Sequence, residues 1–121
     1  MRNFRQRSGT CLARWHVVLL VWALLLLPYT VNAEEPEFTI SIKGNRFDPT
    51  EITIPRDTKI RLVVRNEDAT PEEFESYELN REKIVPANSE IVLFIGPLDP
   101  GTYPFFGEFH QDTANGRVIV Q

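Results

Sequence analysis

The chain has 121 residues, of which 13 are Lys or Arg and 17 are Asp or Glu, so its net charge is -4. Four of the basic residues lie within the first 14 positions, whereas every acidic residue lies from Glu34 onward. Residues 34–121 therefore contain the other nine basic residues and all 17 acidic ones, which gives a net charge of -8 over 88 residues. This balance argues against a nucleic-acid binder, because phosphates are bound by clustered Lys and Arg. The length excludes a chain of several domains.

The first 33 residues have the three parts of a secretory signal peptide. A basic, polar stretch covers 1–16, an unbroken apolar run covers 17–27, and Val31-Asn32-Ala33 fits a cleavage site. The apolar run is shorter than the roughly 20 residues that span a bilayer. We expect cleavage after Ala33 and export to the periplasm or beyond. An uncleaved N-terminal membrane anchor is the alternative.

Cleavage would change the inventory of reactive side chains. It would remove Cys11, which is the only Cys, together with Met1 and His16. The domain at 34–121 would then keep one His, His110, and no Cys. An exported domain of this size without disulfides must be stabilised by its core, by a metal or by partners.

Short apolar segments separated by turn residues predict strands along the whole domain. Phe38, Ile40 and Ile42 alternate with polar residues, as expected of a half-buried strand. The segments that we predict as strands are 37–43, 51–54, 59–65, 72–79, 83–85, 90–95, 102–106 and 117–120. Such strands, with no convincing helix, predict an antiparallel sandwich or barrel of seven or eight strands.

Two of these segments are less simple than the others. The residues EEFESYEL at 72–79 favour a helix by intrinsic propensity, and we expect a strand because the neighbouring segments are strands. Pro104 lacks an N–H group, so 102–106 is expected to be an edge strand or to carry a bulge.

Four pieces of sequence occur in an order that resembles the cupredoxin family of small exported Greek-key β-sandwiches. They cover nearly the whole domain, and the set is more specific than any single piece. The pieces are NRFDPTEITIP at 45–55, KIRLVVRN ending at Asn66 and followed by PEEF at 71–74, DPGTY at 99–103, and FFGEFHQDTANGRVIV at 105–120.

The metal positions depart from the pattern that the resemblance implies. Blue copper proteins of the family use a His after the polar loop, then a Cys, a second His and usually a Met. Here Glu72 stands at the first His position, Gly107 at the Cys position and His110 at the second His position, and no Met follows. A blue copper centre needs a thiolate and two imidazoles, so none is expected.

The same end of the predicted sandwich is rich in oxygen donors. Together with one imidazole, carboxylates suit iron or manganese and could hold Cu(II). The candidate metal ligands are Glu72, Glu73, Glu75, Glu108, His110 and Asp112. If 72–79 is a strand, Glu72 shares the inward face with Phe74, and Glu73 and Glu75 share the opposite face.

The acidic variant resembles the cupredoxin-like proteins associated with bacterial periplasmic iron permeases. This resemblance implies binding, and even oxidation, of ferrous iron before uptake by a membrane permease. Two alternatives stay open: a protein that binds or handles Cu(II), and a metal-free interaction module of a membrane complex. No hydrolytic motif is present, so we do not expect a hydrolase. We favour a protein without enzymatic activity, and oxidation of ferrous iron is the one activity left open.

Overall fold

The computed structural model describes residues 28–31 and 33–121. The chain divides into two compact units, 1–33 and 34–121, and only the second contains strands among the described residues. The predicted signal peptide lies almost wholly outside the described residues and stays a prediction. Within the described residues, no helix has the length and apolar character needed to cross a membrane.

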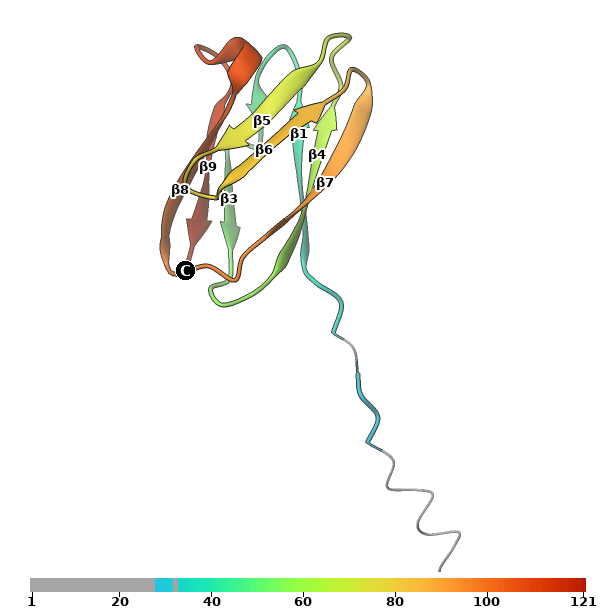
Figure 1. The fold of residues 1–121 in the computed structure, drawn as a ribbon, viewed down its shortest axis with the longest axis vertical. Coiled ribbons are helices and arrows are strands. Elements are labelled where there is room, and N and C mark those ends of the chain that lie inside the picture. Colours follow the sequence, from blue (N-terminus) through green and yellow to red (C-terminus); the bar gives the residue numbers. More distant parts are fainter. Residues whose placement is uncertain (1–27, 32) are drawn as a thin grey trace, which may run out of the picture. The chain divides into compact units, whose positions relative to one another are not determined.

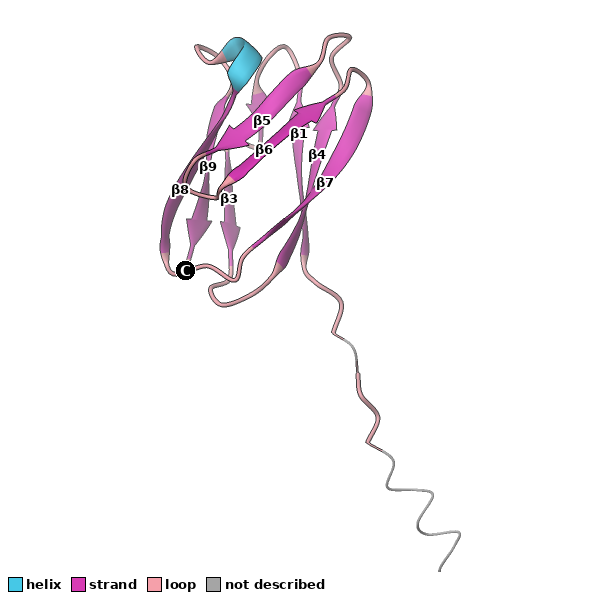
Figure 2. Ribbon diagram, viewed as in Figure 1, coloured by secondary structure: helices cyan, strands magenta, loops and turns pink. Residues whose placement is uncertain are grey.

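Nine strands build the unit at 34–121, and they form two sheets (Figures 1 and 2). The first sheet has the order β2-β1-β4-β7 and the second the order β3-β9-β8-β5-β6. The strands are β1 (Glu37–Ile42), β2 (Phe47–Asp48), β3 (Glu51–Ile54), β4 (Ile60–Asn66), β5 (Glu72–Ser76), β6 (Arg81–Val85), β7 (Ser89–Ile95), β8 (Gly101–Gly107) and β9 (Asn115–Val120). The predicted all-β sandwich is confirmed, with nine strands where the sequence suggested seven or eight.

The core lies between the two sheets and follows from the alternation of apolar residues. In β1 and β3 every second side chain is buried, as in Ile40 and Ile42 or Ile52 and Ile54. Alternate residues of a strand point to the same face, so these side chains meet those of the opposite sheet. One contiguous apolar cluster results, and it draws on residues from all nine strands.

The pairing of the strands is mixed, and the expectation of a purely antiparallel sandwich is wrong. β1 runs parallel to β4, and β3 runs parallel to β9, whereas the other pairs are antiparallel. The parallel partners are far apart in sequence, so a reading of neighbouring segments could not show them.

The expectation of an edge strand or a bulge at Pro104 is also wrong, because β8 lies between β9 and β5 in the sheet. The N–H of Arg117, opposite Pro104 in β9, donates to Thr50 on the far side. Pro104 is therefore in a non-hydrogen-bonded pair with β9, and its nitrogen faces β5. Pairing between β5 and β8 covers only Phe106 and Gly107, so Pro104 removes no ladder bond.

The segment at 72–79 is a strand, as predicted against its helical propensity, but it ends at Ser76. Residues 77–80 turn the chain into β6. The Ser76 hydroxyl fixes this turn, because it donates to the Pro104 carbonyl at 2.6 Å and accepts from the Leu79 N–H at 3.1 Å. Beyond β8, a single 3-10 turn, η2 (Glu108–His110), precedes β9.

Candidate functional site

Glu72 is a carboxylate in the protein interior. β5 buries every second residue, so Glu72, Phe74 and Ser76 face the core. Glu72 is 1% exposed, and β5 begins at this residue, next to η2. The alternation that was predicted for β5 therefore holds, and it aims this one carboxylate inward.

The Glu72 carboxylate is fully engaged by η2 and by its own strand. Oε1 accepts the backbone N–H groups of Phe109 and Glu73, both at 2.9 Å. Oε2 lies 2.6 Å from Nδ1 of His110. An ionised carboxylate only accepts hydrogen bonds, so Nδ1 carries the shared proton and donates. Three donors satisfy the buried group, and this lowers the cost of its burial.

The His110 ring is thereby oriented with its other nitrogen outward. Its side chain is 31% exposed, whereas that of Glu72 is 2% exposed. Among the described residues, none forms a hydrogen bond with Nε2. In the neutral tautomer that donates through Nδ1, Nε2 has a lone pair, and this form can bind a ligand from solvent through Nε2.

Gly107 is required by the same arrangement. A Cβ atom at this position would lie 2.6 Å from Cδ of Glu72 and 2.8 Å from Cβ of Ala114. Real Cβ atoms do not approach so closely, so the Glu72 carboxylate and the Ala114 methyl group fill the space that a side chain at 107 would need. The backbone of Gly107 is tied to Ala114 by a hydrogen bond of 2.9 Å.

An aromatic cluster lies in the core and includes Phe74, which shares the inner face of β5 with Glu72. The ring of Phe47 meets those of Phe74 and Phe105 edge-on, at centroid distances of 6.1 and 5.0 Å. Phe74 and Phe105 stack at 5.1 Å. Such pairs add rigidity to a core, so the site has a firm support on its inner side.

Asn66 is a buried site-forming residue that the sequence analysis did not single out. Its side-chain amide donates to the carbonyls of Thr70 and Val85, and its oxygen accepts the Asp68 N–H. It thus holds the loop that leads into Glu72. An Asn that directly follows an apolar strand and precedes a polar loop was the signal for it.

The six predicted metal ligands do not form one group. Glu72 and His110 are in contact, but Glu73 and Glu75 lie on the outer face of β5, as their register predicted. Glu108 lies close to Glu75 on that outer face, and Asp112 is exposed. Over residues 28–31 and 33–121, no three His, Cys, Asp or Glu side chains are arranged to hold a metal ion.

The outer carboxylates repel one another. A hydrogen bond shared with Glu82, followed by partial desolvation, raises the pKa of Glu73 above its ordinary value. Desolvation, followed by the charge of Glu108, raises the pKa of Glu75. Like charges disfavour the ionised form of each group. These residues therefore form an acidic surface that is distinct from the Glu72–His110 pair.

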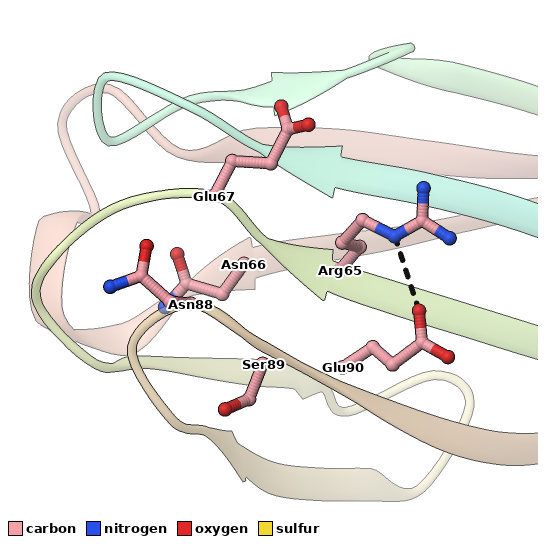
Figure 3. Close-up of a pocket in the computed structure, with 6 residues that line it drawn as sticks. All are labelled: Arg65, Asn66, Glu67, Asn88, Ser89 and Glu90. Carbon is pink, nitrogen blue, oxygen red and sulfur yellow. Dashed lines mark hydrogen bonds and ion pairs between the residues drawn. The ribbon is translucent and has the colours of Figure 1, made fainter.

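A surface hollow, separate from the Glu72–His110 pair, lies where β4 ends and β7 begins (Figure 3). It measures about 370 Å³, is wide open, and is lined by Arg65, Asn66, Glu67, Asn88, Ser89 and Glu90. Arg65 donates to Glu90 across it at 3.1 Å, and the amide of Asn66 is committed to carbonyls. Most of its polar groups thus already have partners.

The fold and the site define a two-sheet sandwich that carries a hydrogen-bonded Glu–His pair in place of an open metal centre. The sequence profile of the cupredoxin-like domain matches residues 16–120. The chain belongs to the cupredoxin-like family.

Similar proteins agree with this assignment. An uncharacterized protein of Rickettsia prowazekii (strain Madrid E) is 44% identical over 110 residues, covering 86% of this chain and 88% of that protein. Auracyanin A, a blue copper protein of Chloroflexus aurantiacus, has a TM-score of 0.63 at 14% identity, covering 73% of this chain and 100% of that one. The metal-binding domain of the Streptococcus pneumoniae D39 Cu(I)-exporting P-type ATPase has a TM-score of 0.63 at 14% identity, covering 70% of this chain and 84% of that one. At these identities the two structures support the fold alone.

The residues present do not fit the blue copper centre that the fold family suggests. The sequence resemblance places the family's thiolate at Gly107, where even a Cβ would collide with Glu72. It places the first imidazole at Glu72, and the oxygens of this side chain are occupied by two backbone N–H groups and by His110. A centre of that type needs a thiolate and two imidazoles, so the chemistry of the site must be different.

Proposed function

We propose that this protein is an exported cupredoxin-like protein that handles Cu(II) transiently, through Nε2 of His110, and does not transfer electrons through a blue copper centre. The observation that carries the proposal is the hydrogen bond of 2.6 Å between Nδ1 of His110 and the buried carboxylate of Glu72. It commits one ring nitrogen to the protein and turns the other one to the surface.

A carboxylate that accepts the second ring N–H is the usual support of a metal-binding His. It fixes the tautomer, fixes the plane of the ring and makes the free nitrogen more basic. The sequence had suggested Glu72 as a direct ligand. In this proposal it is a positioning residue instead. The two backbone hydrogen bonds that Glu72 accepts hold its carboxylate in place whether or not a metal is bound.

We assign Cu(II) to this site because imidazole and oxygen donors bind it more tightly than the other divalent first-row ions. One imidazole leaves most coordination positions to water or to donors of another protein, so binding is weak and exchange is fast. The two solved relatives named above are described as copper proteins, one of them a domain of a membrane transporter. A membrane protein that delivers or accepts copper is the corresponding partner in this proposal.

Isothermal titration and electron paramagnetic resonance of the purified protein with Cu(II) test the proposal. We expect a tetragonal Cu(II) spectrum without intense blue absorption. The variant His110→Ala should lose this binding, and Glu72→Gln should weaken it by about 10- to 100-fold, since losing the support of a metal-binding His has effects of that size. The exposed variant Glu78→Gln is the control and should bind as the wild type does.

Binding by the wild-type protein that is no tighter than that of His110→Ala would reject the proposal. In that case the metal-free interaction module becomes the better description of this protein.

Iron is the second candidate, and the observation that favours it is the group of hard oxygen donors on the outer face. Carboxylates suit Fe(II), Fe(III) and Mn(II) better than soft metals. The association with an iron-uptake permease stays a prediction from the sequence. Titration with Fe(II) under the same conditions separates the two candidates, because iron bound at any of the outer carboxylates would be indifferent to His110→Ala.

A further inference from the structure

The outer face of β5, β6 and β8 combines apolar side chains with carboxylates. Across the β5–β6 ladder, Glu73 lies opposite Ile84 and Glu75 lies opposite Glu82. On the other side of β5, Phe106 lies opposite Glu75. The ring of Tyr77 packs against that of Phe106 at 5.5 Å, and Tyr77 and Ile84 are 72% and 45% exposed.

Four carboxylates gather on this face. Glu82 is the main cause that raises the pKa of Glu73, and desolvation followed by Glu108 raises the pKa of Glu75, so the four groups interact. The charge of Glu75 in turn raises the pKa of Tyr77. We call Glu73, Glu75, Tyr77, Glu82, Ile84, Phe106 and Glu108 the acidic face.

No ion pair neutralises the carboxylates of the acidic face within the described part of the chain. The outer face of the other sheet is different, since Arg61 pairs with Glu37 and Arg65 pairs with Glu90. On the sheet of the acidic face, Arg117 of β9 pairs with Glu51 of β3, so the unbalanced charge is confined to the part formed by β5, β6 and β8.

Arg81 is the basic residue at the border of the acidic face, and its donors point elsewhere. Its Nε and Nη2 donate to the carbonyl of Phe94 at 3.0 and 2.8 Å. Its Nη1 donates to the carbonyl of Asn80 at 2.8 Å. Three good bonds to carbonyls hold this side chain across the edge of β7, so Arg81 does not compensate Glu75 or Glu82.

A surface cavity of about 210 Å³ opens beside these two carboxylates. Its lining consists of Glu75, Ser76, Tyr77, Asn80, Arg81 and Glu82. Two carboxylates, a phenol ring and a hollow suit the end of a Lys or Arg side chain, which can pair with the charges and lie on the ring.

We propose that the acidic face is a docking surface for a basic segment of a partner protein, which inserts a Lys or Arg side chain between Glu75 and Glu82. Charge complementarity selects this partner, because four unpaired carboxylates attract a basic surface and repel an acidic one. Ile84, Phe106 and Tyr77 give the apolar contact at the centre, with carboxylates around it, as protein interfaces commonly have. This inference goes beyond copper handling and does not depend on His110.

The probe for the test is a short peptide of alternating Arg and Leu, with a Glu and Leu peptide of the same length as its control. Binding to the purified protein is followed by fluorescence anisotropy and by the NMR signals of Tyr77 and Ile84. We expect the Arg peptide to bind, with shifts confined to the acidic face, and its affinity to fall as salt rises. The Glu peptide should not bind.

The variant Glu75→Gln/Glu82→Gln should weaken binding of the Arg peptide by about tenfold, as loss of a close charge pair does. The matched variant Glu67→Gln/Asp99→Asn removes the same charge at exposed positions outside the face and should change affinity less than about twofold. His110→Ala should bind the peptide as the wild type does, so a failure of the copper proposal leaves this result intact.

Equal weakening by both double variants would show attraction by net charge alone and would overturn the inference. Shifts of Tyr77 and Ile84 with Fe(II) or Cu(II) at concentrations below those of the peptide would overturn it as well, because the occupant would then be a metal ion.

Discussion

At the scale of single residues, Glu72 and Gly107 depend on each other. The carboxylate is satisfied only because η2 brings the Phe109 N–H and the His110 ring onto it. It has room only because position 107 lacks a side chain. The two positions are therefore linked by packing, and neither can change alone without cost.

The variant Glu72→Ala should lower the free energy of unfolding by about 3 kcal/mol, because it leaves buried donors without an acceptor and creates a cavity. Glu78→Ala, at an exposed position, should change it by less than about 0.5 kcal/mol. Urea unfolding of both variants measures the difference. Equal, small effects would mean that the Glu72 hydrogen bonds contribute nothing to stability.

The variant Gly107→Ala should destabilise the protein by about 1–3 kcal/mol, since its methyl group would overlap Glu72 and Ala114. In the background of Glu72→Ala this cost should shrink by at least about 0.5 kcal/mol, because one of the two obstacles is gone. A double-mutant cycle by urea unfolding gives the coupling. Strict additivity would contradict the packing argument.

At the scale of elements, β5 decides what the site can be. Its sequence favours a helix, yet pairing with β6 on one side and β8 on the other makes it a strand. Tertiary pairing commonly overrides propensity in this way. In a strand, alternation sends Glu72 inward and Glu73 and Glu75 outward, so one element serves both the Glu–His pair and the acidic face.

The variant Ser76→Ala should loosen the end of β5. Loss of its two hydrogen bonds, to the Pro104 carbonyl and from the Leu79 N–H, should cost about 1–2 kcal/mol. Hydrogen exchange of the Leu79 amide should become faster than the loss of global stability explains. Exchange of the β3 amides should change only as much as the free energy of global unfolding does. Ser41→Ala in β1 is the control. An unchanged Leu79 amide would show that the turn is held by other contacts.

At the scale of the molecule, charge is distributed unevenly. Basic residues pair with Glu37 and Glu90 on the sheet of β4 and with Glu51 on the sheet of β9, while the carboxylates of the acidic face lie together without such partners in the described part of the chain. The net charge known from the sequence could have been a uniform solvated surface. Its concentration on β5, β6 and η2 is the basis of the docking role that we propose.

This concentration predicts how stability depends on pH. The pKa values of Glu73 and Glu75 are raised above 4.5 by folding, so the folded protein binds protons more readily than the unfolded chain does. The resulting destabilisation is present at neutral pH, declines as pH falls through the raised pKa values, and is absent below about 4.5.

The variant Glu73→Gln/Glu75→Gln should therefore have a higher urea midpoint than the wild type at pH 7, and the gap should close toward pH 4.5 or in high salt. The control Glu51→Gln/Glu90→Gln removes carboxylates that are paired with Arg117 and Arg65 and should bring no gain. A gap that stays constant with pH would contradict the cause assigned to the raised pKa values.

Much of this molecule could be predicted from its sequence, because alternation and turn residues are local signals. They indicated the strands, the inward direction of Glu72 and the outward direction of Glu73 and Glu75. The parallel pairs β1–β4 and β3–β9 and the central place of β8 depend on contacts between distant segments. The contact of His110 with Glu72 required the position of η2, which the sequence did not indicate.

The proposed role of His110 requires that Glu72 holds its ring with Nδ1 protonated and Nε2 free to bind a metal. Long-range proton–nitrogen NMR of the His110 ring distinguishes the two nitrogens and decides between the two tautomers. We expect a protonated Nδ1, an unprotonated Nε2, and selective broadening of the His110 ring signals by substoichiometric Cu(II). A protonated Nε2, or broadening that spares His110, would rule this role out.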